Sequence, residues 1–286
     1  YHNESGAVCK RADNSVLIVP TATTTVTEDF TVPSNVTEIP SGYLQNNTTL
    51  KTLVIPATVT VIGSNAFRGC TNLESVTFEA RTTELTIGTG AFNSDTALKS
   101  LILPEGLTVI GTSAFGSCTA LESVTLPESL TTISLNAFSG CTALRSIRIP
   151  DGVSSIGNGA FSGCTALEDV TLPAGLETLS RYLFQNCTAL KTITLPAGLT
   201  DFGKAQAFIG CTALEEIRVA SGNTAFKVVD GVLFDASGKT LLYYPAGKQG
   251  SAYLVPEGTA RIGENAFSGA AGLRSVTLSS TVVRIG

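Results

Sequence analysis

The sequence has little of what catalysis requires. Its 286 residues include one histidine, no methionine and no tryptophan, and 14% of them are charged. The histidine, His2, lies in the amino-terminal segment, so a Ser-His-Asp or Cys-His site has no plausible base. No P-loop, dinucleotide-binding or G-x-S-x-G motif occurs. We therefore expect that the protein is not an enzyme and needs no cofactor.

Charge and hydropathy argue against two further classes. The net charge of −5 and a pI near 5.0 disfavour nucleic-acid binding, which depends on clustered lysine and arginine. No apolar run reaches the roughly 18 residues of a membrane span. No signal peptide is visible, and the chain begins with Tyr1 rather than an initiator methionine, which indicates a processed or trimmed product.

A period of 23 residues runs through most of the chain. Phenylalanines, cysteines and prolines all recur at this spacing: Phe92, Phe115, Phe138, Phe161 and Phe184; Cys118, Cys141, Cys164 and Cys187; Pro104, Pro127, Pro150, Pro173 and Pro196. Because three residue types share one period, the chain is built from internal repeats. Units begin at residues 27, 50, 73, 98, 121, 144, 167, 190, 214 and 250, and an incomplete unit begins at 273.

Each unit reads as one turn of a solenoid. In "LESVTLP" (121–127) the apolar residues alternate with polar ones as in a strand, and the proline ends it. The glycine of the "IG" or "FG" pair favours a turn with a positive φ; these are Gly63, Gly111, Gly157, Gly203 and Gly263. The "AFxxC" segment predicts a single helical or 3₁₀ turn that packs its phenylalanine inward. One such unit cannot bury its apolar face, whereas stacked units can.

This pattern resembles the BspA-type (treponemal-type) leucine-rich repeat, whose unit has the same Leu, Pro, Ile-Gly, Ala-Phe and Cys order. The resemblance covers about residues 27–286. It implies a curved, right-handed leucine-rich repeat solenoid, with a parallel β-sheet on one face and short helical or 3₁₀ turns opposite. It also implies a secreted, surface-displayed or periplasmic protein, because family members are typically found there. Several members are adhesins that bind extracellular-matrix or cell-surface proteins.

The recurring cysteine has three possible explanations. Disulfides would leave one of the seven cysteines unpaired, and metal sites usually need ligands at shorter spacing. We favour a third, in which the thiols stack as a buried structural column: Cys70, Cys118, Cys141, Cys164, Cys187 and Cys211. Other units place Asn47, Asp95 or Ala270 there, so the position does not need thiol chemistry, and we expect no metal. Cys9 lies outside the column, and its role stays open.

The exposed positions hold the candidate contacts with a partner. The residue after the first leucine alternates in sign through eight units: Lys51, Glu74, Lys99, Glu122, Arg145, Glu168, Lys191 and Glu215. This alternation favours self-neutralisation over binding. The two outward strand positions are mostly serine and threonine, and Arg148 and Arg218 interrupt them, with Arg145 adjacent. Arginines often anchor interfaces, so these three are candidate contacts.

The period breaks at residues 214–249, where we expect an irregular, hairpin-bearing repeat. Two apolar runs flank "DASGK", a good hairpin turn. Tyr243 and Tyr244 in this segment are further candidates for contact with a partner. We expect residues 1–26 to form an amino-terminal cap, with a strand at "SVLIVP" (15–20), and residues 27–286 to form the repeat domain, whose last repeat is incomplete.

Three functions remain open at this stage. The first is an interaction module that binds an extracellular-matrix or other cell-surface protein, as an adhesin or scaffold. The second is a carrier of a small apolar ligand in a pocket of the solenoid or beside the hairpin. The third is an envelope component that self-associates. None of them involves nucleic acid or membrane insertion.

Overall fold

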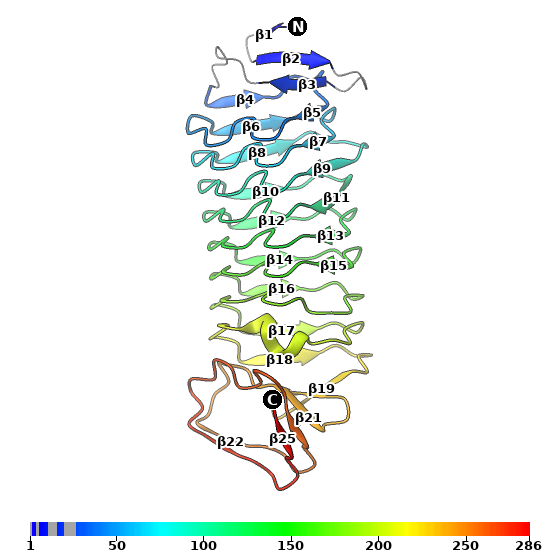
Figure 1. Ribbon diagram of the computed structural model, residues 1–286, viewed down its shortest axis with the longest axis vertical. Coiled ribbons are helices and arrows are strands. Elements are labelled where there is room, and N and C mark those ends of the chain that lie inside the picture. The colour runs from blue at the N-terminus through cyan, green and yellow to red at the C-terminus, as the bar shows by residue number, and fades with distance from the viewer. Residues whose placement is uncertain (1, 4–5, 11–15, 20–26) are drawn as a thin grey trace.

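The computed structural model describes residues 2–3, 6–10, 16–19 and 27–286, with side-chain environments from residue 27 onward except at 204–205. The chain winds into an elongated β-solenoid of about 11 turns, with its two ends at opposite ends of the column (Figure 1). Most turns of the regular part contribute 23 residues, as in the pairing of Ser100 with Ser123 and of Ile102 with Thr125, whereas the turn from Ser75 to Ser100 contributes 25 and the turn from Thr192 to Glu216 contributes 24. The predicted solenoid and its period are thus confirmed.

One parallel sheet contains the strands predicted from the "LxxVTLP" segments. It is formed by β4 (Asp29–Thr31), β6 (Thr52–Ile55), β8 (Ser75–Phe78), β10 (Ser100–Ile102), β12 (Ser123–Thr125), β14 (Ser146–Arg148) and β16 (Asp169–Thr171). Two more strands, β17 (Thr192–Leu195) and β18 (Glu216–Val219), pair in parallel further along the column. We refer to these nine strands together as the front face. Their inward residues alternate with exposed ones, which is the pattern of a half-buried strand.

A second parallel sheet, which the sequence analysis did not foresee, forms at the short segments that precede the "IG" pairs. Its strands are β5 (Glu38–Ile39), β7 (Val61–Ile62), β9 (Leu85–Ile87), β11 (Leu107–Ile110), β13 (Thr132–Ile133) and β15 (Ser155–Ile156). At the amino-terminal end it is extended by β1 (His2–Asn3), β2 (Gly6–Lys10) and β3 (Val16–Val19). Strand β3 lies within the segment where the sequence predicts a capping strand, and it pairs with β5 through Leu17 and Glu38.

The glycines of the "IG" pairs serve a different purpose from the one predicted. A positive φ occurs at Gly203 (64°) but not at Gly63, Gly111, Gly157 or Gly263. A Cβ atom on Gly63 would lie 2.4 Å from the backbone nitrogen of Ser41, and one on Gly157 would lie 2.4 Å from that of Leu135. These positions therefore exclude a side chain because the backbones of successive turns approach closely.

The "AFxxC" segments form successive hydrogen-bonded turns, and one 3₁₀ helix, η1 (Gly203–Phe208), occurs in the described part of the chain. Amide groups donate alternately within a turn and to the next turn. Cys141 N donates to Phe138 O at 3.2 Å, and Phe138 N donates to Ala160 O at 2.8 Å. This alternation satisfies the buried backbone without a regular helix.

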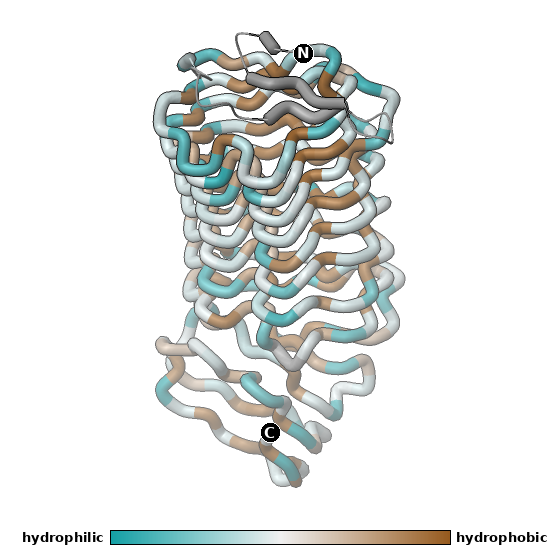
Figure 2. The backbone as a smooth tube through the Cα atoms, turned by 45° about the horizontal axis from the view of Figure 1, so that its top comes forward, coloured by the Kyte–Doolittle hydropathy of each residue, from teal (hydrophilic) through white to brown (hydrophobic). Residues whose placement is uncertain are grey.

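The phenylalanines of these segments stack along the column axis. Six successive pairs have ring centroids 5.2–5.9 Å apart and interplanar angles of 0–15°. The stacked rings are Phe67, Phe92, Phe115, Phe138, Phe161, Phe184 and Phe208, all fully buried. Hydrophobic residues recur at the same places turn after turn (Figure 2), so one core extends along the column.

The irregular segment forms an antiparallel meander. It contains β19 (Phe226–Val229), β20 (Val232–Asp235) and β21 (Thr240–Tyr243), and the turn between β20 and β21 is the one predicted as a hairpin. Parallel pairing then resumes through β23 (Arg261–Ile262) and β25 (Arg284–Ile285), and through β22 (Ala252–Leu254) and β24 (Ser275–Thr277).

Candidate interaction surface

The outward side chains of the front face are exposed over many turns. Most are hydroxyl-bearing, for example Ser100, Ser123 and Ser146 in one column and Thr77 and Thr125 in the other. Such small, β-branched or hydroxylated residues suit a solvated strand, and they leave the face nearly flat. Residues that depart from this pattern are therefore the ones that can distinguish one partner from another.

Two arginines interrupt the hydroxyl-bearing columns, and both are paired with a neighbouring carboxylate. Arg148 on β14 lies 2.7 Å from Glu128, and Arg218 on β18 lies 2.8 Å from Glu216. The hydrogen bond that Arg148 donates to Glu128 raises the pKa of Arg148, and the hydrogen bond that Arg218 donates to Glu216 lowers the pKa of Glu216. Both pairs are solvent-exposed, so they contribute little to the stability of the fold.

The three predicted arginines do not form one cluster. Arg145 is exposed beside β14, close to Arg148, whereas β16 and β17 separate β14 from β18 (Figure 1). Any partner that contacts both Arg148 and Arg218 must extend along the column.

Tyr243 and Tyr244 cannot contact a partner in this fold, because both are buried at 0% and 1% exposure. The ring of Tyr243 lies 5.8 Å from that of Phe208, at the end of the phenylalanine stack. The ring of Tyr244 packs against Tyr253 and Phe267 instead. The alternation of inward and outward residues along a strand does not predict that both tyrosines are buried, because both faces of this part of the meander are covered.

The cysteine column is buried, and its six thiols are free: Cys70, Cys118, Cys141, Cys164, Cys187 and Cys211. Each thiol donates to a backbone carbonyl of an earlier turn. Cys141 Sγ lies 3.2 Å from Phe115 O, and Cys211 Sγ lies 3.0 Å from Phe184 O. Burial raises the pKa of Cys164 to about 12, so its reactive thiolate form is suppressed. The thiol thus serves both as an apolar filler and as a second donor to a backbone carbonyl, since Phe184 O also accepts from Cys187 N at 3.1 Å.

One member of this column is a carboxylate. Asp95 is fully buried, and its Oδ1 accepts a hydrogen bond from Cys70 N at 2.8 Å, while its Oδ2 has no partner. Burial raises the pKa of Asp95 to about 8. At the same position in an earlier turn, Asn47 Oδ1 accepts from Leu50 N at 2.8 Å. Asparagine and aspartate therefore accept backbone N–H groups where cysteine acts as a donor.

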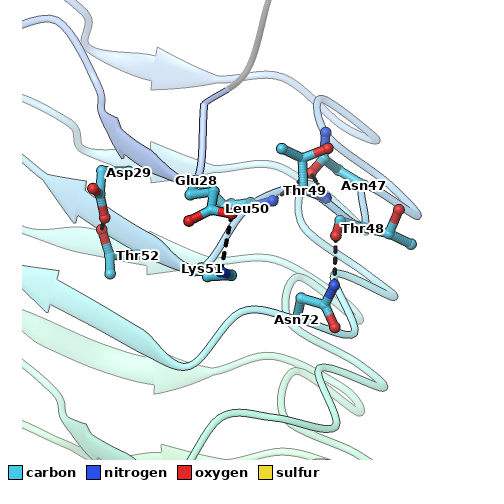
Figure 3. Close-up of polar contacts among 9 residues, drawn as sticks. All are labelled: Glu28, Asp29, Asn47, Thr48, Thr49, Leu50, Lys51, Thr52 and Asn72. Atoms are coloured by element: carbon cyan, nitrogen blue, oxygen red, sulfur yellow. Dashed lines mark hydrogen bonds and ion pairs between the residues drawn. The ribbon is translucent and has the colours of Figure 1, made fainter.

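The two rims of the front face differ in charge. Along the rim that precedes the strands the charges alternate, and Glu28 extends the alternation by one turn. Lys51 lies 2.9 Å from Glu28, and Lys99 lies 3.7 Å from Glu74 (Figure 3 shows the first pair). In this close-up Asp29 also accepts a hydrogen bond from Thr52 on the neighbouring strand.

Along the opposite rim, where the strands end, four successive turns carry carboxylates of one sign. We call Glu79, Glu105, Glu128 and Asp151 the acidic rim; all four are exposed. Glu105 accepts hydrogen bonds from the backbone N–H groups of Glu128 and Ser129, each at 3.1 Å, which lowers the pKa of its carboxyl group. Among the described residues, Glu128 is the one member of the rim in an ion pair.

The acidic rim was missed in the sequence, although a signal was present. Three of its members directly follow the repeating prolines Pro104, Pro127 and Pro150. The alternating charges occupy the position after the first leucine of each unit, whereas the acidic rim occupies a second position, directly after the proline.

The repeat architecture agrees with comparisons to known proteins. The family model of the BspA-type leucine-rich repeat region matches residues 22–145, 85–215 and 250–286 of this chain, with six copies. The chain belongs to the BspA-type leucine-rich repeat family. No curated protein matches the sequence.

Several solved structures are similar to this chain. A leucine-rich cell surface protein from Faecalibacterium prausnitzii A2-165 is 32% identical, with a TM-score of 0.73, over 100% of this chain and 72% of the other. A leucine-rich repeat protein from Bacteroides ovatus is 25% identical, with a TM-score of 0.63, over 100% and 78% of the two chains. The pneumococcal vaccine antigen PcpA, at 23% identity and a TM-score of 0.63 over 99% and 67%, shares the fold.

None of the described residues belongs to a helix with the length and hydropathy needed to cross a membrane. The 3₁₀ helix η1 has six residues.

Proposed function

We propose that this protein is a non-enzymatic interaction module, displayed at the cell surface or secreted, which binds another protein through the front face. The observation that carries the proposal is the continuous exposed face of β4 to β18, on which Ile102, Arg148 and Arg218 interrupt columns of small hydroxyl-bearing residues. Membership of the BspA-type family and the similarity to a cell surface protein support the location. The kind of function is inferred from the fold and stands as a proposal.

The partner in this proposal is an extracellular-matrix or other cell-surface protein, as for an adhesin. Arginine is among the residues most often found at the energetic centre of protein interfaces. Arg148 and Arg218 have exposed side chains, and each forms an ion pair with a neighbouring carboxylate. A bound protein can therefore contact both the arginine and the carboxylate beside it. Shared contacts of this kind favour specificity more than affinity.

The interior of the column supports this proposal over a carrier that holds its ligand inside the solenoid. Stacked phenylalanines occupy the core from Phe67 to Phe208, and the cysteine column fills the adjacent corner. A ligand held between turns would have to separate rings that are less than 6 Å apart. Binding on the outer face requires no such rearrangement.

Binding of the purified chain to a panel of matrix and cell-surface proteins tests the proposal. We expect saturable binding to at least one protein, measured by biolayer interferometry. Arg148→Thr combined with Arg218→Thr is expected to weaken it at least tenfold, because threonine is the common residue of that column. Lys191→Thr, which removes a charge from the alternating rim, is the matched control and is expected to change the affinity less than twofold. Absence of saturable binding across the panel would overturn the proposal.

A further inference from the structure

The front face has a hollow beside β8 and β10, where its hydroxyl pattern fails. The side chain of Ile102 is 71% exposed, although its pairing partner on β12 is Thr125 and the same register leads to Thr77 on β8. A groove of about 510 Å³ opens beside it, with Val76, Phe78 and Pro104 among its lining residues. This volume falls within the range of about 300–1,000 Å³ that is typical of ligand-binding clefts.

An insertion in the repeat builds one wall of this groove. The unit that begins at residue 73 has 25 residues instead of 23, and the extra residues fall in the segment after β8. Arg81 in this segment lies 5.9 Å from the centre of the Phe78 ring, and it donates to Val59 O at 2.6 Å and to Pro56 O at 3.2 Å. The backbone carbonyls of the preceding turn therefore hold the guanidinium group in place, and the wall is fixed.

The charged residues around the groove determine which groups of a partner can bind beside it. Glu79 and Glu105 of the acidic rim lie at its margin, since Glu105 lines the groove and Glu79 lies between Phe78 and Ala80, which also line it. The rim continues through Glu128 and Asp151 over two further turns. Like charges that face each other on neighbouring strands are destabilising. The opposite rim avoids this cost by alternation, whereas this rim keeps one sign over four turns.

We propose that the groove beside Ile102 binds an aliphatic side chain from a partner protein, and that the basic residues next to that side chain lie along the acidic rim. The proposal rests on the proposed function and names the chemistry of its partner. The partner segment is extended, with one aliphatic residue followed by lysines or arginines. Four turns at a spacing of about 4.8 Å span roughly 14 Å, which an extended segment of four or five residues covers.

The front face restricts how such a segment can bind. The backbone groups of β8 and β10 are already paired on both sides, with β6 and β12 as the outer neighbours. The segment therefore cannot join the sheet as an additional strand. Recognition must come from its side chains, which is why the apolar groove and the single-sign rim both matter.

A peptide titration tests this proposal with the full chain. The protein is labelled with ¹³C at its isoleucine δ1 methyl groups, and the probe is acetyl-Gly-Leu-Lys-Lys-Lys-Gly-amide. We expect saturable shifts of the Ile102 methyl signal, with a Kd on the order of 1 mM, because a short flexible peptide must lose its conformational freedom on binding. Raising the salt concentration from 50 to 500 mM is expected to weaken binding several-fold.

Two control peptides separate the parts of the proposal. Replacing the leucine by serine removes the apolar anchor, and replacing the lysines by glutamates reverses the charge. Each change is expected to reduce the affinity at least fivefold. If either control peptide binds as tightly as the original, or if the original causes no shift at 10 mM, the proposal is overturned.

Protein variants locate the site. Ile102→Thr, which restores the residue of the neighbouring turn, is expected to abolish peptide binding, and Glu105→Gln is expected to weaken it two- to fivefold. Leu254→Thr is the matched control, since Leu254 is 67% exposed on β22 outside the groove. Failure of the groove proposal can be distinguished from failure of the proposed function. A protein partner that loses affinity with Arg148→Thr and Arg218→Thr but retains it with Ile102→Thr rejects the groove alone.

Discussion

The regular turns at 27–219 and the segment at 220–286 use the same repeat unit in different ways. In the regular turns one apolar core runs without interruption, and the phenylalanine rings stack nearly in parallel. In the second region the core is a separate cluster that contains Phe234, Tyr244 and Tyr253, and its rings are tilted. Residues of the meander alternate between the two cores, since Leu233 and Tyr243 pack with the first and Phe234 and Tyr244 with the second.

The difference shows what a repeat contributes to stability. Each regular turn makes the same contacts with its two neighbours, so the fold is stabilised by a sum of similar interfaces. The meander of β19 to β21 interrupts this series, and the chain must rebuild a core from residues that do not occupy the repeat positions. Three changes test the comparison, in order of decreasing expected effect.

The largest effect is expected from removing a ring in the middle of the stack. Phe138→Ala takes away the partner of both Phe115 and Phe161, and we expect it to lower the free energy of unfolding by about 3–5 kcal/mol. Phe267→Ala in the second region is the matched variant, and its partly buried ring predicts a smaller loss. Urea denaturation followed by circular dichroism measures both. Equal losses would contradict the difference between the two regions.

The second effect concerns Asp95, the carboxylate within the cysteine column. The pKa of Asp95 is raised to about 8, above its unfolded value of 3.8, so the folded state favours the neutral carboxyl group. Its contribution to stability is fully present below pH 3.8 and is lost as the pH rises through 8. Asp95→Asn removes this dependence, and we expect it to raise the free energy of unfolding by about 2–4 kcal/mol at pH 8.

Denaturation series at pH 4, 6 and 8 measure this change in slope. The gain from Asp95→Asn is expected to shrink to less than about 1 kcal/mol at pH 4, because the carboxyl group is then protonated in the folded state and close to its midpoint in the unfolded state. Glu84→Gln, at an exposed position in the same unit, is the control and is expected to leave the pH dependence unchanged. A parallel pH profile for wild type and Asp95→Asn would contradict the burial of an isolated carboxylate.

The smallest effect is expected from the thiol hydrogen bonds. Cys164→Ala removes one of the two donors to the carbonyl of Phe138, the other being Cys141 N, and it also removes a buried sulfur, which is expected to cost about 1–3 kcal/mol. The reciprocal change, Ala270→Cys, introduces the thiol in the second region, where the side chain at this position is not fully buried. We expect it to change the free energy of unfolding by less than about 0.5 kcal/mol.

A labelling experiment accompanies these two variants. None of the six column thiols is expected to react with a thiol reagent in the native protein, because the pKa of each is raised by burial. The cysteine of Ala270→Cys is expected to react without denaturant. Rapid native labelling at Cys141 or Cys164 would contradict the structural role of the column.

The sequence by itself determined the period, the strand of each unit and the inward positions. These follow from a spacing of 23 residues and from alternation, both of which are local properties. It also placed Arg145, Arg148 and Arg218 on the surface, where the structure has them exposed.

Only the tertiary structure decided the rest, because the remaining features depend on contacts between turns. The second sheet forms where short segments such as Val61–Ile62 find partners one turn away. The glycines that follow its strands, such as Gly63 and Gly157, are required by backbone atoms that lie more than 20 residues away in the chain. Likewise, Tyr243 is buried because Phe208 ends the stack beside it, and the groove beside Ile102 forms because Ala80 and Arg81, in the segment that carries the insertion, line it. A single unit read alone contains none of this information.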